Sequence, residues 1–345
     1  MSQAWIKKLA ASGPFGLVAV ILLLGALLTV FGGTHVDRVS GREVSNFLNW
    51  NTLIQTATDA SFFAVMAVGA TVVIVSGGID LSVGSIYALA GVSMAMLLRA
   101  HPEAGVLTGL LVCLGIGLAC GLANGLMVVG LRVHPFIITL GSMWILRGIA
   151  FVSSRAESIL VPEALTRVAK HPLGLPGTLY PLPMLVMLAT AVVGAVYLER
   201  TVMGRHVFAV GGNPEAARFA GLSLGRIQVG VFLVSGLTAG LAAFMGASFY
   251  GSASCGDAAG YELYVIASAV VGGASLSGGK GSAVSAMLGA LLIVLIRQSI
   301  RTLRFDQNYE WIIIGCAIIV AVVLDQQGAR LAARRLRPQE QGASA

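Results

Sequence analysis

Ten apolar stretches, most of them close to 20 residues long, run through this chain and restrict its fold more than any other feature. An α-helix rises about 1.5 Å per residue, so about 20 apolar residues cross the roughly 30 Å hydrocarbon core of a bilayer. Charged residues make up only 11% of the chain, against about 25% in a soluble domain. The sequence therefore predicts an all-α, polytopic membrane protein of about ten transmembrane helices, organised as one domain over residues 1–345.

The predicted spans alternate with short polar connections. The first apolar stretch is longer than the core of a signal peptide and has no obvious small-residue cleavage site, so we interpret it as an uncleaved span. An even number of spans puts both termini on one side of the membrane. The ten spans are placed at residues 14–31, 60–76, 81–98, 105–129, 135–152, 182–198, 227–250, 261–275, 281–298 and 308–325.

The distribution of Lys and Arg sets the orientation, because cytoplasmic connections carry an excess of both. With the N-terminus inside, the inner side carries twelve basic residues against five acidic ones, and the outer side nine against ten. Both termini are therefore predicted to be cytoplasmic. Three arginines run against this bias on the outer side: Arg297, Arg301 and Arg304. Their spacing of four and three residues puts them on one face of a helix.

The longest positively charged connection lies at residues 199–226, between the sixth and seventh spans, and holds four arginines against two glutamates. Gly212 and Asn213 in its middle predict a turn. Pro214 is favoured at a first helical position, and Gly221 is a stop signal. The pattern predicts a short helix on the cytoplasmic side, and such a helix between two spans is a docking element for a partner protein.

Two segments of the chain resemble each other. VSGGIDLSVGS at residues 75–85 is similar to VVGGASLSGGKGS at residues 270–282, and each lies between two spans. This similarity suggests duplicated halves, as many transporters have.

The first of these segments contains a carboxylate, Asp80, at a glycine-rich helix break. One interpretation is that Asp80 caps the N-terminus of the third span by accepting backbone N–H bonds. The other is that Asp80 is an intramembrane polar site used in transport, because ionisable groups in lipid are costly and usually serve a function. The sequence leaves both open.

Further polar residues occur inside the spans. The amide of Asn124 needs a partner there, either on a neighbouring helix or along a substrate path, and the same alternatives apply to Thr139 and Ser142. Glycines at helical spacing on the fourth and seventh spans predict close helix packing: Gly117, Gly121, Gly125, Gly236 and Gly240. The candidates for the substrate path are Asp80, Ser82, Asn124, Thr139 and Ser142.

No motif for enzymatic chemistry stands out. GGKG at residues 278–281 lacks the flanking Gly and the following Ser or Thr of a phosphate-binding loop, so the chain has no Walker motif. The five histidines and four cysteines show no metal spacing. We therefore expect no catalytic residue, no metal and no cofactor, and the net charge of +7 reflects membrane orientation rather than nucleic-acid binding.

Four segments together resemble the permease subunit of bacterial ABC importers for ribose, xylose, arabinose and galactose. They are GGIDLSVGS at 77–85, NGLMVVGLRVHPFIITLGSM at 124–143, GRHVFAVGGNPEAARFAGL at 204–222 and VVGGASLSGGKGS at 270–282. The resemblance implies the helical architecture of type II importers and a location in the bacterial inner membrane. It also implies three protein partners: a second permease copy or paralogue, a cytoplasmic ABC ATPase and a periplasmic sugar-binding protein. Residues 213–222 match the coupling helix, so the residues expected to contact the ATPase are Gly212, Asn213, Glu215, Arg218 and Gly221.

The predicted function is import of a monosaccharide, either a pentose or a hexose. A sugar cannot cross the hydrocarbon unaided, and a polar path between helices needs few fixed charges for a neutral solute. The first alternative is an ABC permease for nucleosides or branched-chain amino acids. The second is an ion-coupled secondary transporter, which would need intramembrane carboxylates. The three outer arginines are expected either to face headgroups and solvent or to dock the sugar-binding protein.

Overall fold

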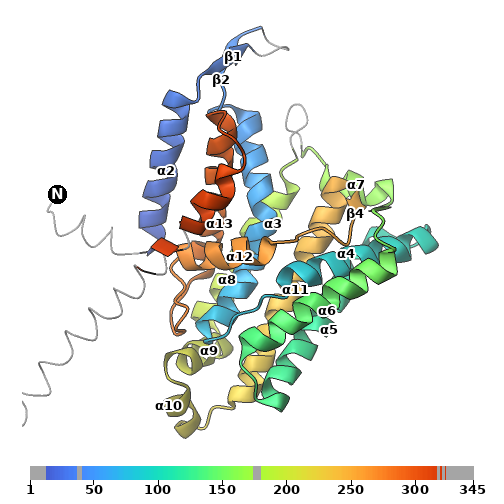
Figure 1. The fold of residues 1–345 in the computed structure, drawn as a ribbon, viewed down its shortest axis with the longest axis vertical. Coiled ribbons are helices and arrows are strands. Elements are labelled where there is room, and N and C mark those ends of the chain that lie inside the picture. The colour runs from blue at the N-terminus through green and yellow to red at the C-terminus, as the bar shows by residue number, and fades with distance from the viewer. Residues whose placement is uncertain (1–12, 37–40, 174–179, 317–318, 321–322, 324–345) are drawn as a thin grey trace, which may run out of the picture.

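The computed structural model describes residues 13–36, 41–173, 180–316, 319–320 and 323. Within them eight helices are long and apolar enough to cross a membrane. Figure 1 shows these helices as a bundle with a short hairpin at one end and two short helices at the other. The eight are α2 (Gly13–Phe31), α3 (Trp50–Val75), α4 (Val83–Ala100), α5 (Val106–Leu131), α6 (Pro135–Ser154), α8 (Leu182–Arg200), α11 (Leu224–Tyr250) and α13 (Ala283–Thr302).

Shorter elements connect the long helices. The hairpin pairs β1 (Thr34–Val36) with β2 (Glu43–Ser45), and a second antiparallel pair joins β3 (Ile159–Leu160) to β4 (Ser252–Ala253). The short helices are α7 (Glu163–Ala169), α9 (Val202–Gly212), α10 (Pro214–Phe219) and α12 (Tyr261–Val271). The all-α membrane class expected from the apolar stretches is confirmed.

Eight of the ten predicted spans coincide with the long helices. At the predicted span 261–275 the structure has α12, whose 11 residues extend only about 16 Å. The backbone continues as an irregular segment to Gly279, whose N–H donates to the carbonyl of Val75 at the end of α3. Helix α12 and this irregular segment together therefore return the chain to the α9 side of the bundle. Residues 309–316 of the predicted span 308–325 are helical, and the remainder lies partly outside the described residues.

The centre of the bundle is α3, whose most apolar window is 94% buried. It is surrounded by α8, α11, α12 and α13. The closest packing joins α5 to α11, where a Cβ added at Gly236 would overlap the carbonyl of Gly117. A Cβ at Gly240 would likewise overlap the carbonyl of Cys113. The close approach predicted from the glycine spacing is confirmed.

The two ends of the bundle differ in character. The β1–β2 hairpin forms one end, and α9 with α10 forms the other (Figure 1). Helix α2 stands at the edge, packs against α13 and has only 6% of its apolar window buried. The N-terminus of α13 follows the segment that contacts α3 and α9, so its C-terminal end, with Arg297 and Arg301, lies on the hairpin side.

Candidate functional site

A fully buried polar network joins three parts of the bundle around Asp80. Oδ1 of Asp80 accepts from the backbone N–H of Ser82 at 2.9 Å and from the Ser82 hydroxyl at 2.6 Å. Oδ2 accepts from the hydroxyl of Ser235 on α11 at 2.7 Å. The amide of Asn124 on α5 donates to Ser82 Oγ at 2.8 Å. The network thus ties the α3–α4 connection to α5 and α11.

A second contact fixes the same connection from α6. Thr139 Oγ1 accepts from the backbone N–H of Leu81 and donates to the carbonyl of Ile79, both at 3.1 Å. The backbone here leaves the helical conformation, so these groups need side-chain partners. Ser142, one turn further along α6, is buried but its hydroxyl has no hydrogen-bond partner.

Four of the five predicted path residues therefore come together, and Ser142 does not join them. All five are at least nine-tenths buried.

The structure also changes the cap interpretation of Asp80. Helix α4 has Ser82 as its N-cap residue, and Asp80 binds one backbone N–H and two hydroxyls rather than several helix N–H groups. Sequence reasoning missed Ser235, which lies 155 residues from its partner.

The end of the bundle formed by α9 and α10 has the turn and short helix that the sequence predicts. Asn213 caps α10, with its Oδ1 accepting from the N–H of Ala216 at 2.9 Å. Ala217 is buried against the core, whereas Glu215 and Arg218 are exposed. Phe219 is 85% exposed. Sequence reasoning did not single out this residue.

The two similar segments end their helices with the same turn. Gly77 after α3 and Gly273 after α12 both have left-handed φ, +87° and +89°. The next residue in each case, Gly78 or Ala274, donates to the carbonyl five residues earlier. When the two segments are aligned from Val75 and Val270, Gly77 pairs with Gly272, so the equivalent turn residue, Gly273, is displaced by one position. The turn supports the interpretation of these segments as related.

The three outer arginines do not form one exposed stripe. Arg297 Nε lies 2.8 Å from Glu310 Oε1, and its guanidinium stacks over the rings of Phe63 and Tyr264. Arg301 lies 3.7 Å from Asp59 on α3. Because α13 ends at Thr302, Arg304 is outside the helix, with φ +58°. Arg297 is thus held within the chain.

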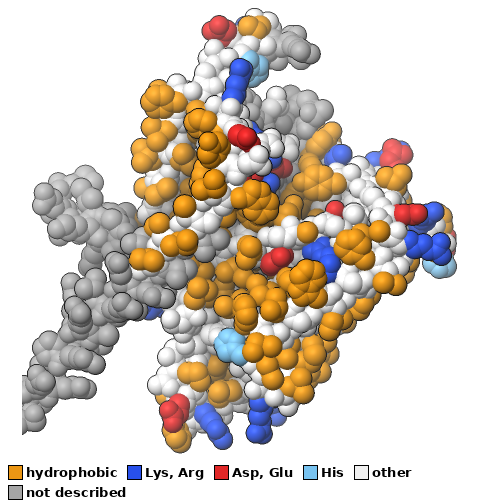
Figure 2. All heavy atoms as spheres, viewed as in Figure 1, with side chains coloured by type: hydrophobic (Ala, Val, Ile, Leu, Met, Phe, Trp, Pro, Cys, Tyr) orange, Lys and Arg blue, Asp and Glu red, His pale blue; other side chains and the backbone are white. Residues whose placement is uncertain are grey.

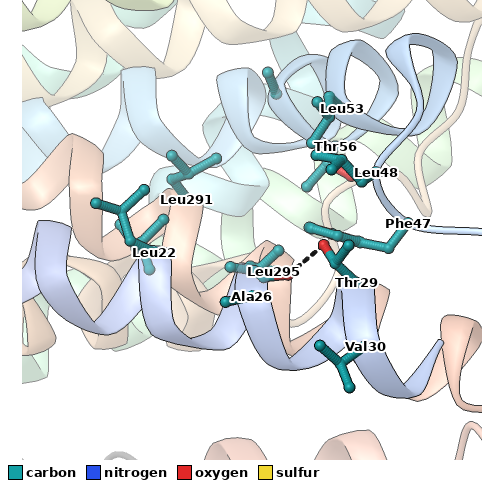
Figure 3. Close-up of a pocket in the computed structure, with 13 residues that line it drawn as sticks. Leu22, Ala26, Thr29, Val30, Phe47, Leu48, Leu53, Thr56, Leu291 and Leu295 are labelled. Carbon is teal, nitrogen blue, oxygen red and sulfur yellow. Dashed lines mark hydrogen bonds between the residues drawn. The ribbon is translucent and has the colours of Figure 1, made fainter. Parts of the chain in front are cut away.

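An apolar cavity of about 640 Å³ lies between α2, α3 and α13 (Figure 3). Its hydroxyls are already bonded within their own helices, Thr29 to the carbonyl of Gly25 and Thr56 to that of Thr52. Leucines from all three helices point toward it. A groove without free polar groups does not suit a hydrophilic solute.

A smaller cavity, about 340 Å³, is lined by both apolar and charged side chains and lies between α4, α6 and the segment before α12. Arg147 on α6 donates through Nη1 to the carbonyls of Cys255 and Asp257, at 2.7 and 2.6 Å. Glu262 and Ser85 also line the cavity, and each has a buried oxygen without a hydrogen-bond partner. Arg147 therefore reaches toward the bundle, not out to the membrane surface.

The long apolar helices define the class of polytopic helical membrane proteins. Among the described residues, no group of three His, Cys, Asp or Glu side chains could hold a metal ion. The chain belongs to the family described as the permease component of the branched-chain amino acid transport system, which matches residues 52–322. No solved structure matches the chain significantly.

Curated relatives resemble almost the whole chain. The ribose import permease protein RbsC of Escherichia coli (strain K12) is 34% identical over 290 residues, covering 82% of this chain and 88% of the relative. The D-allose transport system permease protein AlsC of the same strain is 35% identical, covering 88% and 90%. The L-arabinose ABC transporter permease protein AraH of Azospirillum brasilense is 33% identical, covering 90% and 87%.

Proposed function

We propose that this chain is the membrane-spanning permease of an ABC importer that moves a monosaccharide from a periplasmic binding protein into the cytoplasm. The observation that carries this proposal is the near full-length similarity to permeases named for ribose, allose and arabinose. The family description names amino acids, whereas these relatives, which align over most of both chains, are named for sugars. The chain itself is a transport subunit rather than an enzyme.

Energy for transport comes from a partner, because the chain has no phosphate-binding loop. The exposed end formed by α9 and α10 is the surface on which a cytoplasmic ABC ATPase docks. The residues proposed for this contact are Gly212, Asn213, Glu215, Arg218 and Gly221, and we add Phe219 because its ring is exposed beside them. Closure of the ATPase on ATP moves α10, and the helices anchored to it shift between outward and inward states.

The surrounding assembly follows from the same proposal. A second permease copy or paralogue completes the transport unit, and the exposed apolar faces of the outer helices contact lipid or that copy. The unit lies in the bacterial inner membrane with both termini cytoplasmic, so the β1–β2 hairpin faces the periplasm. The buried network around Asp80 positions the α3–α4 connection beside the path.

Reconstituted uptake tests the proposal. Proteoliposomes holding the full chain, its cognate ATPase and the loaded binding protein are expected to accumulate one of D-ribose, D-allose, D-fructose or L-arabinose when ATP is supplied. Uptake driven by a proton or sodium gradient without ATP would contradict it, as would ATP-driven uptake of L-leucine or a nucleoside in place of every sugar. Empty liposomes and liposomes without the ATPase are the controls.

The outer end is proposed to receive the binding protein through Arg301 and Arg304, since Arg297 is engaged within the chain. Reversing both to Glu is expected to slow uptake several-fold at low ionic strength when the binding protein is limiting, because opposite charges steer encounter. The deficit should shrink as salt rises, with screening over about 10 Å at 0.1 M. Initial rates are measured against salt concentration. A deficit independent of salt, or one equally large for Arg99→Glu on α4, would rule out this docking role.

A further inference from the structure

The cavity between α4, α6 and α12, which holds Arg147 and Glu262 among apolar side chains, is not explained by packing. Two of its oxygens, Ser85 Oγ and Glu262 Oε2, are buried and lack any hydrogen-bond partner. Ser85 is 0% exposed. A buried polar group left unpartnered is destabilising by about 1–3 kcal/mol, so a chain that keeps two of them in one cavity gains something else from them.

The position of the cavity excludes a lipid-facing role. Arg147 lies seven residues before the end of α6 at Ser154, which is about 10 Å along the helix axis. Ionisable side chains at such depth face a protein interior or a water-filled space, not hydrocarbon. Figure 2 shows basic and acidic side chains near the middle of a largely hydrophobic face. The cavity therefore opens toward an aqueous path or a second copy of the chain.

We propose that this cavity, lined by Ser85, Trp144, Arg147 and Glu262, is a contact site for the transported monosaccharide. This inference rests on the proposed function and names the residues of its substrate path. A volume of about 340 Å³ falls within the range of about 300–1,000 Å³ found for small-molecule sites. The site differs from the Asp80 network, whose hydrogen bonds are already satisfied within the chain.

The donor and acceptor set suits a neutral polyol. The Glu262 carboxylate accepts from sugar hydroxyls, and the Ser85 hydroxyl both donates and accepts. Trp144, which is 69% exposed, offers an apolar ring face beside these groups. Arg147 has Nη1 committed to two backbone carbonyls, so it holds the 255–257 segment and keeps its other N–H groups for the ligand.

The geometry around Glu262 positions its carboxylate. The carboxylate lies against the first turn of α4, where a Cβ at Gly84 would be 2.6 Å from Glu262 Oε2. A helix N-terminus is a favourable place for a carboxylate, and Glu262 Oε2 remains without a hydrogen-bond partner there. Glycine at position 84 is what permits this approach.

Uptake by three variants tests the site. Ser85→Ala removes a hydroxyl that bonds nothing in the chain, so folding should be unaffected, whereas sugar uptake at saturating binding protein should fall about 2- to 10-fold. Glu262→Gln should lower it at least 10-fold. The matched control is Ser248→Ala on α11, whose hydroxyl is also buried and unpartnered but lines a separate apolar cavity. ATP hydrolysis stimulated by the loaded binding protein should stay at the wild-type rate in Ser248→Ala.

A binding measurement separates sugar contact from indirect effects. In a Cys316→Ser background, thiol labelling of Met143→Cys, inside the cavity, should slow at least twofold when millimolar sugar is present. Labelling of Val152→Cys, 81% exposed on the same helix, should not change. Unchanged labelling at both positions, or Ser85→Ala and Glu262→Gln uptake equal to that of Ser248→Ala, would overturn the site while wild-type sugar uptake persists. If the wild type carries no sugar at all, the proposed function itself fails.

Discussion

Asp80→Ala is expected to lower the free energy of unfolding by about 3 kcal/mol, because it leaves three buried donors without their acceptor. The donors are the N–H and hydroxyl of Ser82 and the hydroxyl of Ser235. None can turn to water, since the residues around them are buried. The measurement is chemical unfolding of the purified chain in detergent, together with its abundance in the membrane.

Two comparison variants sharpen this prediction. Asp80→Asn keeps the shape and one acceptor oxygen, and its amide can donate to the Ser235 hydroxyl, so the loss should be about 1 kcal/mol with most uptake retained. Asp59→Ala removes a carboxylate that accepts from exposed Gln55 at 3.0 Å and makes a long pair with half-exposed Arg301, and should cost less than about 1 kcal/mol. If Asp80→Asn unfolds normally but carries no sugar, the carboxylate acts in transport and our structural interpretation is wrong.

Exchange of the two charges on α10, Glu215→Arg with Arg218→Glu, is expected to abolish coupled uptake while the permease stays in the membrane. The exchange keeps the net charge and the helix cap at Asn213 but presents the ATPase with the wrong charge at both positions. Phe219→Ala should separately weaken ATPase binding at least tenfold, since a protruding aromatic ring is a typical interface anchor. Copurification of the ATPase and ATP-driven uptake are the measurements.

A matched control lies on α7, at the end of the bundle away from α10. Glu163 and Arg167 form an exposed pair on the short helix α7, with Nη2 and Oε1 3.0 Å apart. Exchanging these two charges should leave ATPase copurification at the wild-type level. Equal loss of copurification in both exchanges, or wild-type uptake after the α10 exchange, would contradict the docking assignment.

Local patterns decided much of the architecture. The eight long helices fall where apolar stretches predict them, because an isolated helix in lipid satisfies its own backbone hydrogen bonds and needs no distant partner. The same holds for α10, whose cap, first-turn proline and terminal glycine lie within nine residues of one another. The glycines of α5 and α11 also predicted close helix packing, but they did not predict that these two helices pack against each other.

Tertiary structure decided the rest. The sequence suggested that Asp80 is either a cap or a path residue, and only folding brought it to Ser235, 155 residues away. The sequence predicted that Arg297 belongs to an exposed stripe. In the structure Glu310 and two aromatic rings contact its guanidinium instead. The cavity around Glu262 is formed by α4, α6 and α12 together, so no single segment of the sequence predicts it. Helices form from interactions within one turn, whereas the partner of a buried polar group is selected by which helices pack together, and that selection depends on the whole bundle.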